Sequence, residues 1–286
     1  MLGRADSTAG PVVTPALFRC ARILVFNRAE KSETNGQPCA MPSDFLLIDN
    51  SNSFTKFALG TRKEVGASRK LATRTLTPDA MGNIIRQWEW KTAVLCSVVP
   101  EVGERIAEYL APRRVLRVTA KLKLGVGIDY PKPMTIGADR LANAAGAWAR
   151  YGGPVVVVDF GTAVSFDVVS GEGKYVGGVI APGLEAMTDY LHTRTALLPE
   201  ITLTEPPTAI GKSTKHAMLS GAVYGYRGLV RQILQEIGKE LGIAKNLPVV
   251  ATGGYAELIA AGLPEIRTVQ EDLTLDGLRI IGTLNA

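Results

Sequence analysis

Short apolar runs alternate with longer segments of helical periodicity from Phe45 to the end of the chain. Apolar runs rich in β-branched residues predict buried strands, here over residues 45–49, 54–59, 93–99, 155–159, 164–169 and 248–251. Apolar side chains spaced three and four apart predict helices over residues 79–89, 100–110, 137–150, 183–192, 214–240, 254–262 and 273–283. Ser213 or Thr214 is suited to cap the helix predicted over 214–240. Alternating strands and helices are typical of an α/β protein with a mostly parallel or mixed sheet covered by helices.

The first 43 residues lack this pattern. They are rich in Gly, Pro, Ser and Thr, and Arg19 and Arg22 interrupt their apolar patch. A secretory signal needs an uninterrupted apolar core, so we interpret residues 1–43 as a poorly ordered extension. The rest of the chain is long enough for two lobes, which we expect at residues 44–150 and 151–286.

Composition narrows the possible classes of function. The chain of 286 residues is 46% hydrophobic and 21% charged, as in folded globular proteins. It has no apolar run near the roughly 18 residues of a membrane-spanning helix, so no membrane is expected as a partner. The net charge of +5 is scattered along the chain, which disfavours a nucleic-acid partner. Three cysteines without metal-like spacing favour a reducing, cytoplasmic location, and two histidines make a zinc site or a histidine-based triad unexpected.

An approximate internal repeat is the most informative feature of the sequence. Residues 46–55 align with residues 156–165, and each copy is a buried strand ending in Asp, a turn of small polar residues and a second strand. A buried carboxylate needs a cation or hydrogen-bond donors, and small turn residues let backbone amides approach a phosphate. Two facing hairpins of this kind predict a nucleotide cleft between two related lobes. Alternatively, Asp159 accepts backbone hydrogen bonds within an ordinary turn.

Two further segments carry candidate chemistry. Asp139 and Arg140 begin an Ala-rich helix, where Asp139 could accept a proton from a substrate hydroxyl while Arg140 fixes an anionic substrate. Alternatively, Asp139 complements the helix dipole and forms an ion pair with Arg140. The glycines of residues 177–183 indicate close approach of the backbone, either to a ligand or to another element. Residues 211–214 end like a P-loop, but Pro206 occupies the position of its first glycine, so that motif is rejected.

In combination these segments resemble the type III pantothenate kinases, of the superfamily that includes actin, hexokinase and the heat-shock ATPases. The resemblance extends from Phe45 to the C-terminus and is carried, in the family order, by residues 97–100, 130–131, 137–140, 157–163, 177–183, 195–199, 209–214, 252–254 and 273–278. It implies two related α/β lobes of the actin-like (ribonuclease H-like) type with a nucleotide cleft between them. The implied activity is ATP-dependent phosphorylation of pantothenate to 4'-phosphopantothenate, the first step of coenzyme A biosynthesis.

The resemblance also implies roles for individual residues. Asp139 would be the general base, and the pantothenate site would comprise Tyr130, Gly137, Ala138, Arg140 and Thr214. ATP would be held by Thr162 and by the first hairpin, residues Asp49, Asn50, Ser51, Asn52, Ser53, Phe54, Thr55 and Lys56. Asp49 would organise Mg²⁺ indirectly, and Asp159 would bind a monovalent cation, K⁺ or NH₄⁺. Members of the family are homodimers whose substrate site lies at the dimer interface.

The first hairpin departs from the family pattern Asp-x-Gly-Asn-Thr, because Ser51 replaces the glycine. If Ser51 has a positive φ, the turn is strained by about 1 kcal/mol, and Ser51→Gly should lower the Michaelis constant for ATP. A serine hydroxyl that donates to a phosphate would have the opposite effect. The altered hairpin keeps open a second function, that of a non-catalytic regulatory or accessory protein on the same scaffold. A phosphatase that activates water is disfavoured, since residues 130–140 suit an anionic substrate.

Overall fold

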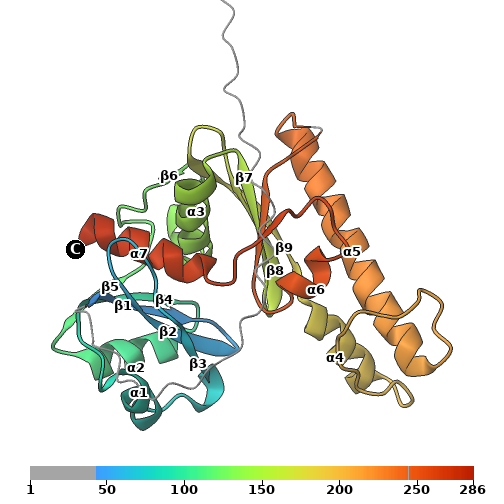
Figure 1. Ribbon diagram of the computed structural model, residues 1–286, viewed down its shortest axis with the longest axis horizontal. Coiled ribbons are helices and arrows are strands. Elements are labelled where there is room, and N and C mark those ends of the chain that lie inside the picture. Colours follow the sequence, from blue (N-terminus) through green and yellow to red (C-terminus); the bar gives the residue numbers. More distant parts are fainter. Residues whose placement is uncertain (1–42, 244) are drawn as a thin grey trace, which may run out of the picture. The chain divides into compact units, whose positions relative to one another are not determined.

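The computed structural model describes residues 43–243 and 245–286, so the predicted extension lies outside the described residues except for Ser43. Two sheets organise the described part of the chain (Figure 1). The first has the strand order β3-β2-β1-β4-β5, and the second has the order β11-β10-β7-β8-β9-β6. Within the described ranges, no helix is long and apolar enough to cross a membrane.

The first sheet is built on an antiparallel hairpin to which two parallel strands are added. Its strands are β1 (Ser43–Asn50), β2 (Phe54–Gly60), β3 (Arg69–Ala72), β4 (Trp90–Ser97) and β5 (Arg114–Arg117). β1 pairs antiparallel with β2 and parallel with β4. Leu46 and Ile48 of β1 pack with residues of α1 (Pro78–Ile85) and α2 (Pro100–Leu110). Side chains of a strand alternate between faces, so Phe45 and Leu47 join a different cluster on the other face.

The second sheet repeats this arrangement. Its strands are β6 (Gly127–Ile128), β7 (Val155–Phe160), β8 (Ala163–Val169), β9 (Lys174–Pro182), β10 (Val249–Thr252) and β11 (Thr268–Val269). β7 pairs antiparallel with β8 and parallel with β10, as β1 does with β2 and β4. Val156 and Val158 pack in a cluster with residues of the helix Thr214–Glu240. The helices of this part are α4 (Leu184–Arg194), α5 (Thr214–Glu240) and α6 (Ala256–Ala260).

Two helices that pack against each other connect the sheets. α3 (Ala138–Tyr151) and α7 (Leu273–Asn285) contact each other closely, and α3 also contacts β4, β7 and β8 while α7 contacts β1 and β4. Their backbones come so close that a Cβ on Gly277 would stand 1.9 Å from the carbonyl oxygen of Ala142. Their apolar faces share one core with Phe45 and Leu47 of β1 and Val155 of β7. The core of the first sheet therefore includes the last helix of the chain.

The predicted strands and helices are all present, with ends displaced by a few residues. The largest differences are at α1, which ends at Ile85, and at α6, which is shorter than residues 254–262. Ser213 caps α5, since its Oγ accepts a hydrogen bond from the backbone N of His216 at 3.2 Å. The predicted strand ranges did not include the short strands β3, β5, β6 and β11, all four of which lie at sheet edges, nor the glycine-rich strand β9. Edge strands such as Arg69–Ala72 face solvent and lack a continuous apolar signal.

Candidate functional site

The turns of the two hairpins face each other across a cavity of about 310 Å³. The hydroxyls of Ser53 in the first turn and Thr162 in the second are hydrogen-bonded at 3.0 Å. Asp49 and Asp159, each the last residue but one of its strand, β1 and β7, both line the cavity. Its other lining residues are Ser51, Ser53, Phe54, Lys56, Phe160, Gly161, Thr162, Glu185, Thr252, Gly253, Gly254, Tyr255 and Thr274. The prediction of two facing hairpins is therefore confirmed.

The cavity has an excess of carboxylates. Asp49 is only 5% exposed, and this burial raises its pKa to about 6. The charges of Asp159 and Asp139 act in the same direction, while Lys56 lowers the pKa of Asp49. Burial likewise raises the pKa of Asp159, and Asp139 adds to that effect. With Glu185, three carboxylates and one lysine line the cavity, and the resulting net negative charge favours the entry of cations.

The oxygen atoms that line the cavity suit a hard cation whose other ligands are water or phosphate oxygens. Among the described residues, no three His, Cys, Asp or Glu side chains gather closely enough to hold a metal ion by themselves. Mg²⁺ commonly takes only one or two carboxylates and completes its shell with water and substrate phosphates. Asp49, Ser53 and Thr162 line the same cavity, and their oxygen atoms fit that pattern of shared coordination.

Asp159 has a side-chain partner that the sequence did not predict. Asn143 of α3 donates from Nδ2 to Asp159 Oδ2 at 3.0 Å, and Thr274 of α7 donates to Asn143 Oδ1 at 2.8 Å. The Thr274 hydroxyl thereby fixes which end of the amide faces Asp159. This contact favours the site interpretation over the ordinary turn. The sequence holds one indication of this contact: Asn143 lies four residues after Asp139 and therefore on the same side of the helix.

Asp139 and Arg140 at the start of α3 have separate partners. Asp139 Oδ1 accepts a hydrogen bond from the backbone N of Arg140 at 2.8 Å, whereas the Arg140 guanidinium donates from Nε to Asp167 Oδ1 at 2.6 Å. Burial raises the pKa of Asp139, and the Arg140 amide and charge lower it. The Asp139 carboxylate therefore does not form a close ion pair with the Arg140 guanidinium. A carboxylate whose pKa is raised is also the better proton acceptor.

The glycine-rich segment of β9 is shaped by close approach to other elements. A Cβ on Gly178 would stand 1.7 Å from the carbonyl oxygen of Phe166 and 3.0 Å from an Arg140 terminal nitrogen. Gly177 has φ +128° and lies beside Tyr130, whose ring meets the Tyr175 ring edge-on at 6.1 Å. The glycines thus allow β9 to approach Arg140 and Tyr130 directly.

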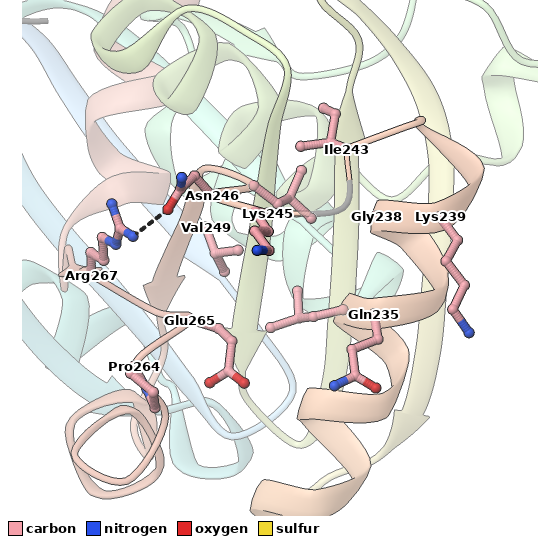
Figure 2. A pocket seen from close by; sticks show the side chains of 12 residues that line it. Gln235, Gly238, Lys239, Ile243, Lys245, Asn246, Val249, Pro264, Glu265 and Arg267 are labelled. Atoms are coloured by element: carbon pink, nitrogen blue, oxygen red, sulfur yellow. Dashed lines mark hydrogen bonds between the residues drawn. The ribbon is translucent and has the colours of Figure 1, made fainter.

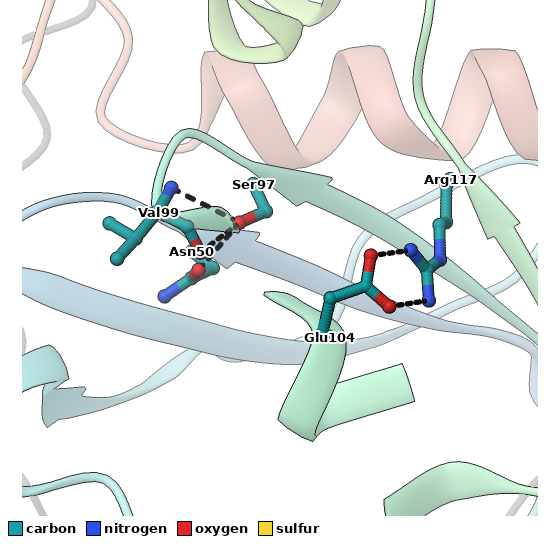
Figure 3. Close-up of polar contacts among 5 residues, drawn as sticks. All are labelled: Asn50, Ser97, Val99, Glu104 and Arg117. Atoms are coloured by element: carbon teal, nitrogen blue, oxygen red, sulfur yellow. Dashed lines mark hydrogen bonds and ion pairs between the residues drawn. The ribbon is translucent and has the colours of Figure 1, made fainter. Parts of the chain in front are cut away.

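Several residues predicted for the site face elsewhere. Asn50 and Thr55 are buried beneath the first turn, where Asn50 Nδ2 donates to Thr55 Oγ1 at 2.8 Å. Asn50 Oδ1 also accepts from Ser97 Oγ at 2.7 Å, near the ion pair of Glu104 and Arg117 (Figure 3). Asn52 is exposed in the turn itself. The side chains of Asn50 and Thr55 therefore support the turn from below.

Gly137 and Ala138 line a cavity of about 330 Å³ beside the N-terminus of α3. Thr214 lines a different one, of about 790 Å³, between α4 and α5. A further cavity of about 530 Å³ lies where α5 ends and β10 begins, lined by Lys245, Glu265 and Arg267 among others (Figure 2). None of the residues predicted for the site lines this last cavity, which is distinct from the cleft between the hairpins.

The expectation of strain at Ser51 is wrong. Asn246 is the sole non-glycine residue with positive φ among the described residues, so Ser51 lies outside the left-handed region. Its backbone N donates to Phe54 O at 3.1 Å, and its Oγ donates to Asp49 Oδ1 at 3.1 Å. The serine thus closes the turn without the backbone geometry that requires glycine, and it adds a donor to the Asp49 carboxylate. Ser51→Gly is no longer expected to lower the Michaelis constant for ATP.

Comparison with known proteins gives the family. The model of the family "type III pantothenate kinase" matches residues 45–236, more than half of the chain. The chain belongs to the type III pantothenate kinase family. A type III pantothenate kinase of Akkermansia muciniphila is 52% identical over 243 residues, which cover 84% of this chain and 99% of that protein. One from Methylacidiphilum infernorum is 41% identical over 239 residues, covering 84% and 88% of the two chains.

Two solved structures share the fold of this chain. A Campylobacter jejuni protein described as a Baf family transcriptional activator superposes with a TM-score of 0.56 at 17% identity, covering 82% of this chain and 96% of its own. A Sinorhizobium meliloti protein described as a 2-dehydro-3-deoxygalactonokinase gives a TM-score of 0.56 at 15% identity, with 83% and 95% covered. The predicted fold, two related α/β lobes of the actin-like type, is confirmed.

Removing the Asp49 carboxylate should stabilise the ligand-free kinase at alkaline pH. The pKa of Asp49 rises from 3.8 to about 6 on folding, so its ionisation opposes folding as the pH rises through that window. We expect Asp49→Asn to raise Tm at pH 8 by about 2 °C or more, the shift that roughly 1 kcal/mol produces in a chain of this size. The gain should shrink towards zero at pH 4. Asp189→Asn, at an exposed position of α4, is the control, and an equal or lower Tm for Asp49→Asn at pH 8 would contradict the assignment.

Proposed function

We propose that this chain phosphorylates the terminal hydroxyl of pantothenate with ATP, giving 4'-phosphopantothenate in the first step of coenzyme A biosynthesis. The observation that carries the proposal is the cavity between two Asp-ended hairpins, with the Asp139 carboxylate close enough to raise the pKa of both aspartates. The unstrained turn at Ser51 removes the main reason to favour a non-catalytic accessory protein. The free buried thiol of Cys96 is compatible with the cytoplasmic location that we propose.

In this proposal the ATP phosphates occupy the cavity between the two turns. The hydroxyls of Ser53 and Thr162, already within one hydrogen bond of each other, would donate to phosphate oxygens. Lys56, which lines the same cavity, supplies positive charge. Asp49 would hold Mg²⁺ through water, and the ion would neutralise charge on the phosphates. Positioning and charge neutralisation account for most of the catalysis of phosphoryl transfer.

Pantothenate would lie beside the start of α3, within reach of Asp139. Tyr130, Gly137, Ala138 and Arg140 surround this carboxylate in the proposal, and Arg140 holds the anionic group of the substrate. Asp139 accepts the proton of the terminal hydroxyl while that oxygen forms its bond to the γ-phosphorus of ATP. The bond to the β-γ bridging oxygen breaks, and ADP leaves with that oxygen.

Replacing the base should abolish turnover without unfolding the protein. Asp139→Asn is nearly isosteric and retains an oxygen for the Arg140 amide, but it cannot accept the proton. We expect kcat to fall by about 10²–10⁴-fold, measured as ADP release with and without pantothenate in a potassium buffer. Asp79→Asn, at an exposed position of α1, should retain full activity. Near wild-type turnover of Asp139→Asn would exclude Asp139 as the base.

We further propose that Asp159 binds a monovalent cation. Its side chain is half-buried, and it has one amide donor, Asn143, as a hydrogen-bond partner, so a cation would offset the remaining charge. The neighbouring Asp139 increases that demand.

The rate should therefore depend on the salt. At equal ionic strength, K⁺ or NH₄⁺ should support faster turnover than Na⁺, and K⁺ should raise Tm relative to Na⁺. Asp159→Ala should remove both responses, and the effect on Tm can be measured even if this variant is inactive. Equal rates and equal Tm values of the wild type in the three salts would refute the cation site.

We also propose a homodimer formed across α4 and α5. The cavity containing Thr214 is lined mostly by apolar residues, and Met187, Tyr190 and Leu191 beside it are exposed. Gly221, Gly225 and Gly228 follow one face of α5, and a Cβ on any of them would meet no atom within 4 Å. A second copy that packs its own α5 against this face would cover the apolar surface and bring Thr214 to the partner's substrate site.

A bulky side chain on this face should separate the subunits. In analytical ultracentrifugation we expect the wild type to have twice the 30.5 kDa mass of one chain and Gly225→Trp to have the mass of one chain. In the enzyme assay Gly225→Trp should have a raised KM for pantothenate. Gly171→Trp, in an exposed turn, is the control and should remain dimeric. A wild type that is monomeric at assay concentrations would disprove the proposed interface.

A further inference from the structure

A fully buried carboxylate that the proposed mechanism does not use lies next to the substrate arginine. Asp167 of β8 has no exposed surface, yet three side chains donate to it. Arg140 Nε reaches Oδ1 at 2.6 Å, the Tyr175 hydroxyl reaches Oδ1 at 3.3 Å, and Ser165 Oγ reaches Oδ2 at 3.2 Å. Burial raises the pKa of Asp167 to about 6, the charge of Arg140 lowers it, and the 2.6 Å contact between the two side chains is an ion pair.

Asp167 contacts Arg140 only at Nε, so both terminal nitrogens of the guanidinium remain available. A guanidinium carries five N–H donors in a planar fork, and Asp167 takes only the one on Nε. Within residues 43–243 and 245–286, the terminal nitrogens of Arg140 donate no hydrogen bond. The two terminal nitrogens together are able to bind a carboxylate through two parallel hydrogen bonds.

The surroundings hold the guanidinium in one orientation. Its Cζ lies 5.7 Å from the centre of the Tyr175 ring, a cation–π distance, and the same tyrosine donates to Asp167. On the β9 side a terminal nitrogen lies 3.0 Å from where a Cβ on Gly178 would stand, at a position that the Phe166 carbonyl oxygen, 1.7 Å from that Cβ, reserves for glycine. The side chain of Arg140 is 16% exposed, which leaves it a limited opening to solvent.

We propose that Asp167 is a positioning residue for substrate specificity: it holds Arg140 through Nε and so presents both terminal nitrogens to the carboxylate of the substrate. Ser165 and Tyr175 in turn hold Asp167. This inference rests on the proposed function, in which Arg140 binds the anionic end of pantothenate. It assigns the recognition of that end to a side chain on β8 that does not itself touch the substrate.

A double-mutant cycle tests the inference. Asp167→Asn keeps the size of the side chain and an acceptor for Nε, but removes the charge. We expect it to raise KM for pantothenate about tenfold or more, while kcat and KM for ATP change less than about threefold. Asp167 acts through Arg140, so Asp167→Asn should have no further effect on KM for pantothenate in an Arg140→Ala background.

The same measurements include a control variant and results that would overturn the inference. Glu205→Gln alters another arginine–carboxylate pair, with Arg227, and should leave both Michaelis constants unchanged. Equal effects of Asp167→Asn on kcat and on both Michaelis constants, or an undiminished effect in the Arg140→Ala background, would overturn the inference. If Asp167→Asn does not fold, Ser165→Ala and Tyr175→Phe each remove one donor and should give smaller increases in KM for pantothenate that vanish without Arg140. A wild type without pantothenate kinase activity would instead refute the proposed function.

Discussion

The burial of carboxylates at the ends of two strands is the constraint on which the cleft depends. Asp49 and Asp159 follow runs of apolar residues that form the interiors of the two sheets, so Asp49 is buried and Asp159 half-buried. The fold gives each of them a neutral donor, Ser51 for Asp49 and Asn143 for Asp159, and Lys56 is the nearby positive charge. This incomplete neutralisation makes the cavity suited to phosphates that arrive with cations.

α3 links this cavity to the remaining chemistry. Asp139 and Arg140 lie at its start, and Asn143 lies in the next turn. Arg140 is tied to β8 through Asp167, and Asn143 is tied to β7 through Asp159. The contact at Gly277 holds the other side of the helix against α7. The position of the proposed base relative to the two hairpins is therefore determined by one helix that is anchored along its length.

The sequence predicted the hairpins, the order of strands and helices, and the residues of the two turns, because each depends on neighbours in the chain. A strand that ends in Asp before small polar residues has few local alternatives, and the helical spacing of α3 and α5 continues over several turns. The edge strands escaped prediction because their stability comes from pairing with a neighbour rather than from their own apolar content. The expectation of a strained Ser51 came from the identity of the residue alone, whereas the turn accommodates a serine without positive φ.

The sequence alone determined the helices and the strands of the two hairpins, the family and the chemical groups available to the site, since these follow from local spacing and from motifs in a fixed order. The tertiary structure alone decided how those groups are paired. Arg140 meets Asp167, 27 residues away, instead of the adjacent Asp139, and Thr274 orients an amide that is 131 residues distant. It also placed Thr214 on the lining of a cavity between α4 and α5, while Gly137 and Ala138, predicted for the same pantothenate site, line another. The physical reason is that buried charges and amides must find their partners among whatever side chains packing brings within hydrogen-bond distance, and that distance is set by the fold and not by separation along the chain.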